Sequence, residues 1–135
     1  MRFKTLEFRR HECYGPCPVY SIKVHSNGFV EWHGEMFVKI FGETSWQISA
    51  QAVEDLGQAL DDASFAQLKE KYDDYCMTDM SACTIAVELP DGKILTVYHY
   101  HGHFDAPKKL DVLEAAIDSI VGTKSYVGDK GFLDA

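Results

Sequence analysis

The sequence predicts an α+β fold, in which an antiparallel β-sheet, built as a meander of hairpins, is covered on one face by two to three helices. Two regions, at about residues 20–48 and 84–101, alternate apolar with polar side chains, which is the period of a half-buried strand. The stretches after each of them repeat apolar residues every three or four positions, which is the period of an amphipathic helix. The expected order of elements is therefore β-β-β-α-α-β-β-α.

The first hairpin is expected to turn at residues 26–28, which read Ser-Asn-Gly. A three-residue loop pairs Val24 with Val30 and Ile22 with Trp32, whereas a two-residue Asn-Gly turn would set core residues opposite polar ones. Because register follows the burial of one face, we predict the three-residue loop, with its glycine in the left-handed conformation. The meander is expected to continue from about Met36 to Phe41 and then from Trp46 to Ile48, around Gly42.

The middle of the chain is expected to be helical. Ser49 can cap a helix whose apolar side carries Val53, Leu56 and Leu60. Residues 64–67, Ser-Phe-Ala-Gln, match the capping-box pattern and should open a second, short helix. The acidic stretch from Tyr72 to Asp79 is expected to be a loop.

The second hairpin is expected to turn at residues 90–92, Pro-Asp-Gly. A three-residue loop there pairs Ile85 with Val97 and places Cys83 opposite His99, whereas a two-residue loop would turn His99 to the other face. We therefore predict that His99 is buried beside Cys83 and is held by a hydrogen bond, or by a metal ion if the fold binds one. The last helix should begin near Pro107, end at Gly122 and bury one stripe, formed by Leu110, Leu113, Ile117 and Ile120.

Length and charge restrict the class of protein. At 135 residues the chain is expected to form a single domain, 1–135, with a core at about 3–122 and a C-terminal tail at 123–135. Its net charge of -8 would repel a phosphate backbone, so nucleic acid is not an expected partner. No apolar run approaches the roughly 20 residues of a membrane span, and residues 1–10 lack the apolar core of a signal segment. We therefore expect a soluble, acidic, cytoplasmic protein.

Two motifs carry a resemblance to a known family. The first is Cys13-Tyr14-Gly15-Pro16-Cys17-Pro18-Val19-Tyr20, followed by Asn27-Gly28 and Gly34, and the second comprises Val97-Tyr98-His99-Tyr100, Gly102, Ala106-Pro107, Leu110, Leu113-Glu114, Ile117-Asp118 and Gly122-Thr123. From about Leu6 to Tyr126, the chain resembles an uncharacterised bacterial family, domain of unknown function 6438, with the pattern C-[FY]-G-x-C-P-x-Y. Tyr126 stands where such domains have a tryptophan. The resemblance supports the predicted fold and implies no activity, and it implies relatives that are often secreted or lipid-anchored.

The turn Cys13-Tyr14-Gly15-Pro16-Cys17 is the first candidate functional feature. It could be a redox pair, a disulfide, half of a metal site, or two reduced thiols that fix a tight turn. Its C-x3-C spacing differs from the C-x2-C of thioredoxin-like proteins and zinc knuckles, and cytosolic disulfides are rare. We therefore predict that both thiols are reduced in protein made in the cytoplasm.

The second candidate group comprises Cys76, Cys83, His99 and His101. The two histidines alternate along a strand and so point to one face, and imidazole is a ligand of zinc, copper and nickel. However, the cysteine spacing matches no standard zinc motif, and no H-E-x-x-H pattern occurs. The sequence therefore favours a hydrogen-bonded His99, a solvated His101, a fold that forms without stoichiometric zinc, and no cofactor.

The leading hypothesis from the sequence is a non-enzymatic binding or accessory module. It would present the Cys13–Cys17 turn and the nearby sheet edge to an unidentified protein or small-molecule partner. The chain has no nucleophile elbow, P-loop or dinucleotide fingerprint, which argues against the simplest enzymes. The alternative hypothesis is a metal- or thiol-dependent activity that uses this turn or a cluster of Cys83, His99 and His101.

Overall fold

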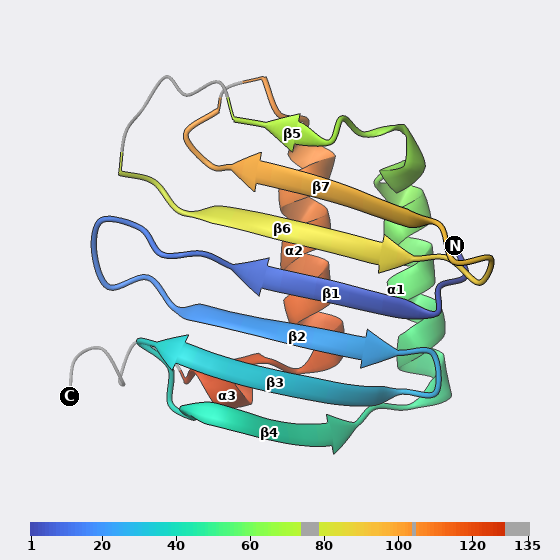
Figure 1. Ribbon diagram of the computed structural model, residues 1–135, viewed down its shortest axis with the longest axis horizontal. Helices are drawn as coiled ribbons and strands as arrows, with labels where there is room; N and C mark the ends of the chain where they lie inside the picture. The colour runs from blue at the N-terminus through green and yellow to red at the C-terminus, as the bar shows by residue number, and fades with distance from the viewer. Residues whose placement is uncertain (74–78, 104, 129–135) are drawn as a thin grey trace.

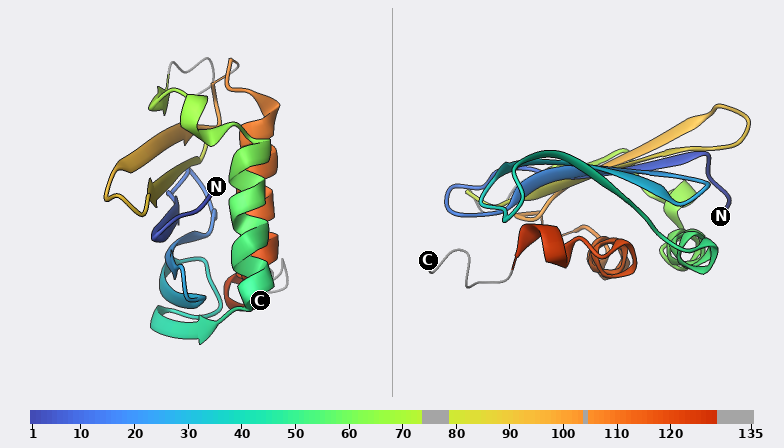
Figure 2. Two further views of the ribbon diagram at one scale, coloured as in Figure 1. Left: turned by 90° about the vertical axis from the view of Figure 1, so that its right-hand side faces the viewer. Right: turned by 90° about the horizontal axis from the view of Figure 1, so that it is seen from below.

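The computed structural model shows one β-sheet with two long helices side by side on one of its faces (Figures 1 and 2). The structure describes residues 1–73, 79–103 and 105–128. The elements in chain order are β1 (Thr5–Arg10), β2 (Val19–His25), β3 (Phe29–Met36), β4 (Gly42–Gln47), α1 (Ala50–Asp62), the 3₁₀-helix η1 (Phe65–Gln67), β5 (Lys71–Tyr72), β6 (Ala82–Glu88), β7 (Ile94–Tyr100), α2 (Lys108–Val121) and α3 (Lys124–Val127). The predicted α+β class is confirmed, and none of the described helices is long and apolar enough to cross a membrane.

The sheet is mostly antiparallel, and its strands β1 to β4 form a meander as predicted, but the order of the whole sheet differs from the prediction. Its strand order is β4-β3-β2-β1-β6-β7-β5, so β1 lies at the centre between β2 and β6, and the two-residue β5 runs parallel to β7. The expected order of elements lacks β1, β5 and α3. Leu6 and Phe8 in β1 are fully buried between charged neighbours. The alternation of these apolar residues with polar ones is typical of a strand, but the many charged residues in this segment hid that pattern.

The predicted strand at Met36 to Phe41 is wrong, because this segment turns away from the sheet. Phe37 has a positive φ of 53°, and the backbone N–H groups of Lys39 and Ile40 donate to carbonyls at the end of α3. Those donors are therefore not available to a neighbouring strand. The strand forms afterwards, as β4, and pairs in full with β3.

The predicted second helix is reduced to one 3₁₀ turn, η1. Ser64 does not act as its cap, because it adopts a left-handed conformation with φ 50° and its side chain makes no capping hydrogen bond. The capping-box pattern requires an extended cap residue, so the sequence match was misleading here. Most of the expected acidic loop from Tyr72 to Asp79 lies outside the described residues, and its first residue belongs to β5.

Both predicted hairpin registers are confirmed. Val24 pairs with Val30 in the first hairpin, and Cys83 pairs with His99 in the second. The first loop needs its glycine for two reasons. Gly28 has a φ of 89°, and a Cβ atom there would approach the carbonyl oxygen of Ile48 to 2.4 Å.

The core lies between the sheet and the two long helices. Ser49 caps α1 as predicted, because its side chain accepts a hydrogen bond of 3.0 Å from the backbone N–H of Ala52. Helix α2 buries Leu110, Leu113 and Ile117 and ends at Gly122, which has a φ of 85°. No described helix covers the opposite face of the sheet (Figure 2). Helix α2 crosses the strands (Figure 1). This crossing brings its acidic side chains against strand residues that are far away in the sequence, such as Asp118 against Arg10.

Candidate metal centre

Segments from the sheet and from α2 meet near the beginning of this helix. Strand β7 places His99 on the core face because side chains alternate along a strand. His101 is the first residue after β7, and its backbone N–H donates to the carbonyl of Ser81, which holds it beside β6. From the other side, α2 contributes Asp111 and Glu114, which lie three positions apart and so share one face of the helix.

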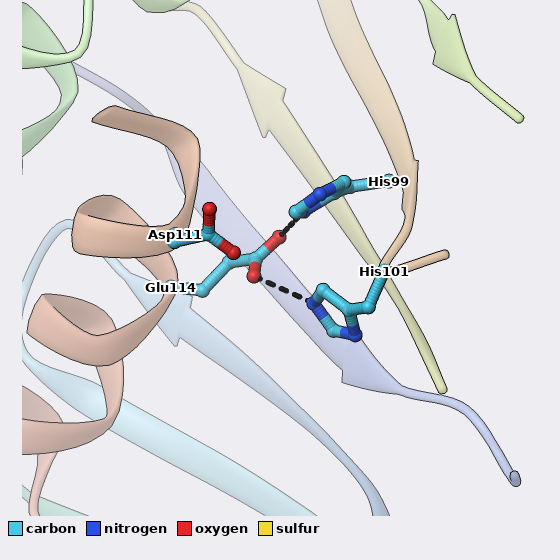
Figure 3. Close-up of side chains that lie close together, drawn as sticks. All are labelled: His99, His101, Asp111 and Glu114. Atoms are coloured by element: carbon cyan, nitrogen blue, oxygen red, sulfur yellow. Dashed lines mark hydrogen bonds and ion pairs between the residues drawn. The ribbon is translucent and has the colours of Figure 1, made fainter. Parts of the chain in front are cut away.

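These four side chains form a compact set of possible metal ligands. His99, His101, Asp111 and Glu114 each offer one ligand atom, and the four atoms all lie within 4.8 Å of one another. Figure 3 shows the Glu114 carboxylate between the two imidazoles, with Asp111 beside it on the same helix. His99 and Glu114 are buried, His101 is half-buried and Asp111 is exposed, so the cluster has a solvent side and a core side.

Glu114 holds both imidazoles in place. Its Oε2 atom lies 2.6 Å from Nδ1 of His99, and its Oε1 atom lies 2.9 Å from Nε2 of His101. Burial acts to raise the pKa of Glu114, but hydrogen bonds from His101 and His99 outweigh it and lower the pKa below its ordinary value. An ionised carboxylate only accepts hydrogen bonds, so both of these ring nitrogens carry hydrogen. In the neutral form of His101, Nδ1 accepts a hydrogen bond from the Ser81 hydroxyl, 2.8 Å away.

Cys83 extends this cluster toward the centre of the sheet. Its thiol accepts a hydrogen bond of 3.4 Å from Nη1 of Arg10. Burial raises the pKa of Cys83 far above its ordinary value, the nearby Arg10 counteracts this only in part, and the nearby charge of Glu114 helps to raise the pKa. The side chain is therefore a neutral thiol, which argues against a role as a nucleophile because the reactive species is the thiolate.

A second polar cluster lies one turn further along α2. Asp118 accepts hydrogen bonds from Nη2 of Arg10 at 2.7 Å, from the hydroxyl of Tyr20, and from the hydroxyl of Thr123 at 2.6 Å. Arg10 also contacts Cys83, so the two clusters form one continuous polar chain beneath α2. No buried side-chain nitrogen or oxygen lacks a hydrogen-bond partner in the part of the chain that the structure describes. The chain of contacts is therefore complete without a ligand.

The first cluster has the chemistry of a transition-metal site. Two imidazoles and two carboxylates give two nitrogen and two oxygen donors, which suits zinc and its neighbours better than Mg²⁺ or Ca²⁺, because those ions prefer oxygen-only sets. A metal ion would replace the two ring hydrogens that His99 and His101 share with Glu114. The Ser81 hydroxyl could then accept from Nδ1 of His101, which is the outer contact that metal-bound histidines commonly make.

The prediction that the Cys13–Cys17 turn is reduced is wrong for this structure, because the two residues form a disulfide. They lie in the connection between the adjacent strands β1 and β2, and a tight turn, marked by a bridge between Cys13 and Gly15, brings their Cα atoms to 5.7 Å. Disulfides form in this range of Cα separations. The sequence prediction relied on the difference from C-x2-C spacing, but the tight turn allows a C-x3-C pair to form a disulfide as well. Tyr14 lies within the ring and is 85% exposed.

The structure brings together three of the four residues in the second predicted group. Cys83, His99 and His101 meet as predicted, although His101 contacts Glu114 and is not simply solvated. Cys76 lies outside the described residues. His99 is buried and hydrogen-bonded, which confirms the prediction made from the hairpin register.

The functional residues that sequence reasoning missed are the acids of α2. Glu114 lies four positions after Leu110 and three before Ile117, so it occupies the apolar stripe that faces the sheet. An acid at such a position needs a buried partner, and this is a signal that the sequence contained. Asp111 carried no comparable signal, because an acid in the first turn of a helix is ordinary.

The fold and this cluster can be compared with known proteins. A family model matches residues 4–121, and the chain therefore belongs to the family described as domain of unknown function (DUF6438). This match confirms the resemblance inferred from the cysteine motif and the closing helix. A search among curated proteins finds no match to the chain.

Proposed function

We propose that the chain is a non-enzymatic binding module whose ligand is a divalent transition-metal ion held by His99, His101, Asp111 and Glu114. One observation carries the proposal: four donor atoms of suitable chemistry, from two separate parts of the chain, lie within 4.8 Å of one another. The proposal keeps the class of protein that the sequence favoured but moves the binding site from the cysteine turn to the contact between β7 and α2.

The ligand set favours binding over catalysis. Catalytic zinc sites typically have three protein ligands and leave one position for water, whereas structural sites use four. Here Asp111 can supply the fourth donor from the solvent side. The nearby thiol of Cys83 is buried and neutral, so it adds no nucleophile to the site.

Folding should not depend on the ion. In the structure, Glu114 already satisfies His99 and His101, and the apolar stripe of α2 is buried around it. The metal would therefore bind to a site that is already formed, unlike the small zinc domains that are unfolded without metal.

The experiment is a calorimetric titration of metal-stripped protein with Zn²⁺, followed by Co²⁺ titration monitored by visible absorption. We expect one ion per chain, a cobalt spectrum typical of four-coordinate nitrogen and oxygen ligands, and no comparable heat with Mg²⁺. Loss of a residue that only supports a metal ligand weakens metal binding by roughly 10- to 100-fold. Glu114→Gln changes a proposed ligand itself, so it should weaken zinc binding by more than this.

The matched control is Glu54→Gln, the same chemical change at an exposed position of α1. It should leave the affinity for zinc unchanged. If wild-type protein binds no zinc at micromolar concentrations, or if both variants bind as well as wild type, the proposed function is wrong.

A further inference from the structure

The Cys13–Cys17 disulfide occupies an exposed loop that the proposed metal site does not involve. The loop connects β1 to β2, and the three residues enclosed by the bridge, Tyr14, Gly15 and Pro16, are all exposed. Both cysteines are half-buried and belong neither to the sheet nor to the hydrophobic core. The bridge is therefore accessible to a reagent without any opening of the core.

The strand ends that the loop connects are held together independently of the bridge. Arg10, the last residue of β1, pairs with Tyr20 near the start of β2. Both side chains also bind Asp118 of α2, and the Tyr20 ring stacks on Trp32 at a centroid distance of 4.7 Å. None of these contacts involves Cys13 or Cys17, so we expect them to remain when the disulfide is opened.

The third described cysteine cannot compete with this pair. Cys83 is 1% exposed, so its sulfur is shielded from reagents in the folded protein. Exchange at Cys83 in the folded protein would therefore require the core to open. Within the described residues, thiol chemistry is confined to the β1–β2 loop.

We infer that the Cys13–Cys17 pair is a thiol–disulfide exchange site that cycles between bridge and dithiol, with a dithiol reductant or a disulfide substrate as its reaction partner. In the reductive direction, a thiolate of the partner attacks one sulfur and the S–S bond breaks. The other cysteine sulfur leaves with the electron pair and takes up a proton. The second thiol of the partner then attacks the mixed disulfide, which releases the first cysteine as a thiol. Two electrons and two protons pass to the protein, and the partner becomes a disulfide.

The test treats folded protein with dithiothreitol, blocks free thiols with iodoacetamide before any denaturant is added, and maps the labels by mass spectrometry. We expect Cys13 and Cys17 to gain labels together while Cys83 stays unlabelled. The near-UV circular dichroism spectrum should keep its shape, and the melting temperature should fall by roughly 10 °C or less, because the bridge closes only a short ring. Reduction that occurs only in denaturant, or that abolishes the near-UV spectrum, would overturn the inference.

The reverse reaction gives a second readout. Reduced protein mixed with oxidised glutathione should re-form the bridge and release two glutathione thiols for each bridge formed, and Cys17→Ser should instead stop at a mixed disulfide on Cys13. The control is the double variant Cys13→Ser, Cys17→Ser, which should fold like the reduced protein and release two fewer glutathione thiols per chain than wild type. An unfolded peptide of residues 11–18 gives the reference rate for closing the bridge. If folded wild-type protein re-forms its bridge at this rate, the fold does not obstruct exchange, which supports the inference. Failure of the folded, reduced protein to react contradicts the inference.

Discussion

At the scale of single residues, Glu114 connects the helix to the sheet. Its two oxygens accept from His99 and His101, and its side chain is only 4% exposed. A buried carboxylate is costly unless it is hydrogen-bonded, and here each of its oxygens accepts from one imidazole. Removing the acid therefore affects every partner at once.

The first prediction concerns this residue. Glu114→Ala leaves the buried His99 and the half-buried His101 without their acceptor and should lower the free energy of unfolding by about 3 kcal/mol or more. Glu114→Gln should cost less, because an amide can still accept from one imidazole and donate to the other. Urea unfolding of both variants, with Glu54→Ala as an exposed control, measures the difference. Equal losses for Glu114→Ala and Glu54→Ala would show that the contacts contribute little.

A second prediction at this scale concerns Tyr20 and pH. Burial, assisted by Asp118, raises the pKa of Tyr20 above its ordinary value of 10.0. The unfolded chain releases this proton near pH 10, whereas the folded chain keeps it. The stability contributed by the protonated hydroxyl is therefore fully present below pH 10 and is lost as the pH rises further.

The free energy of unfolding should thus decline above pH 10, by at most about 1.4 kcal/mol per pH unit from this group. Tyr20→Phe removes the titrating hydroxyl and should decline less steeply between pH 10 and 11. Urea unfolding at several pH values gives both slopes. If wild type and variant lose stability with pH at the same rate, the pKa of Tyr20 is the same in the folded and the unfolded chain.

At the scale of elements, α2 is joined to the sheet by apolar contacts and by two acids, Glu114 and Asp118, that lie one helical turn apart. Asp118 is 22% exposed and accepts from three side chains, including Arg10. We predict that Asp118→Ala lowers the free energy of unfolding by about 3 kcal/mol, because it leaves the Arg10 charge without its partner. Asp111→Ala, on the exposed side of the same helix, should change it by less than about 0.5 kcal/mol. Similar values for the two variants in urea unfolding would contradict this account of the helix contact.

Local patterns predicted individual elements better than they predicted their arrangement. The pairing of Val24 with Val30 and of Cys83 with His99 followed from burial of one face alone, and the cap at Ser49 followed from one side chain. The central place of β1 depends on pairing with β6, which lies far away in the sequence and leaves no local trace. The candidate metal site could not be predicted from local patterns for the same reason. Glu114 meets His99 only because α2 packs across β7, which is a long-range contact.

At the scale of the whole molecule, the polar contacts beneath α2 are complete among the described residues without a metal ion, and a hydrophobic core of buried side chains forms without one. We predict that protein stripped of metal by excess chelator stays folded and still melts in one cooperative transition. Saturating zinc should raise the melting temperature, because an ion that binds only the folded state at about 100 times its Kd adds about 2.7 kcal/mol. A thermal melt of the full chain measures both effects. Unfolding by chelator would show that the metal is required for the fold.

The most direct test of the proposed metal site is to observe the imidazole nitrogens of the six histidines by long-range ¹H–¹⁵N NMR, with and without one equivalent of Zn²⁺. The structure predicts that Nδ1 of His99 and Nε2 of His101, which both carry hydrogen against Glu114 in the metal-free protein, lose it and take the shifts of zinc-bound nitrogens. The nitrogens of the remaining histidines should keep their positions. Zinc-dependent shifts confined to other histidines, or no shifts at all, would contradict the proposal that this cluster binds metal.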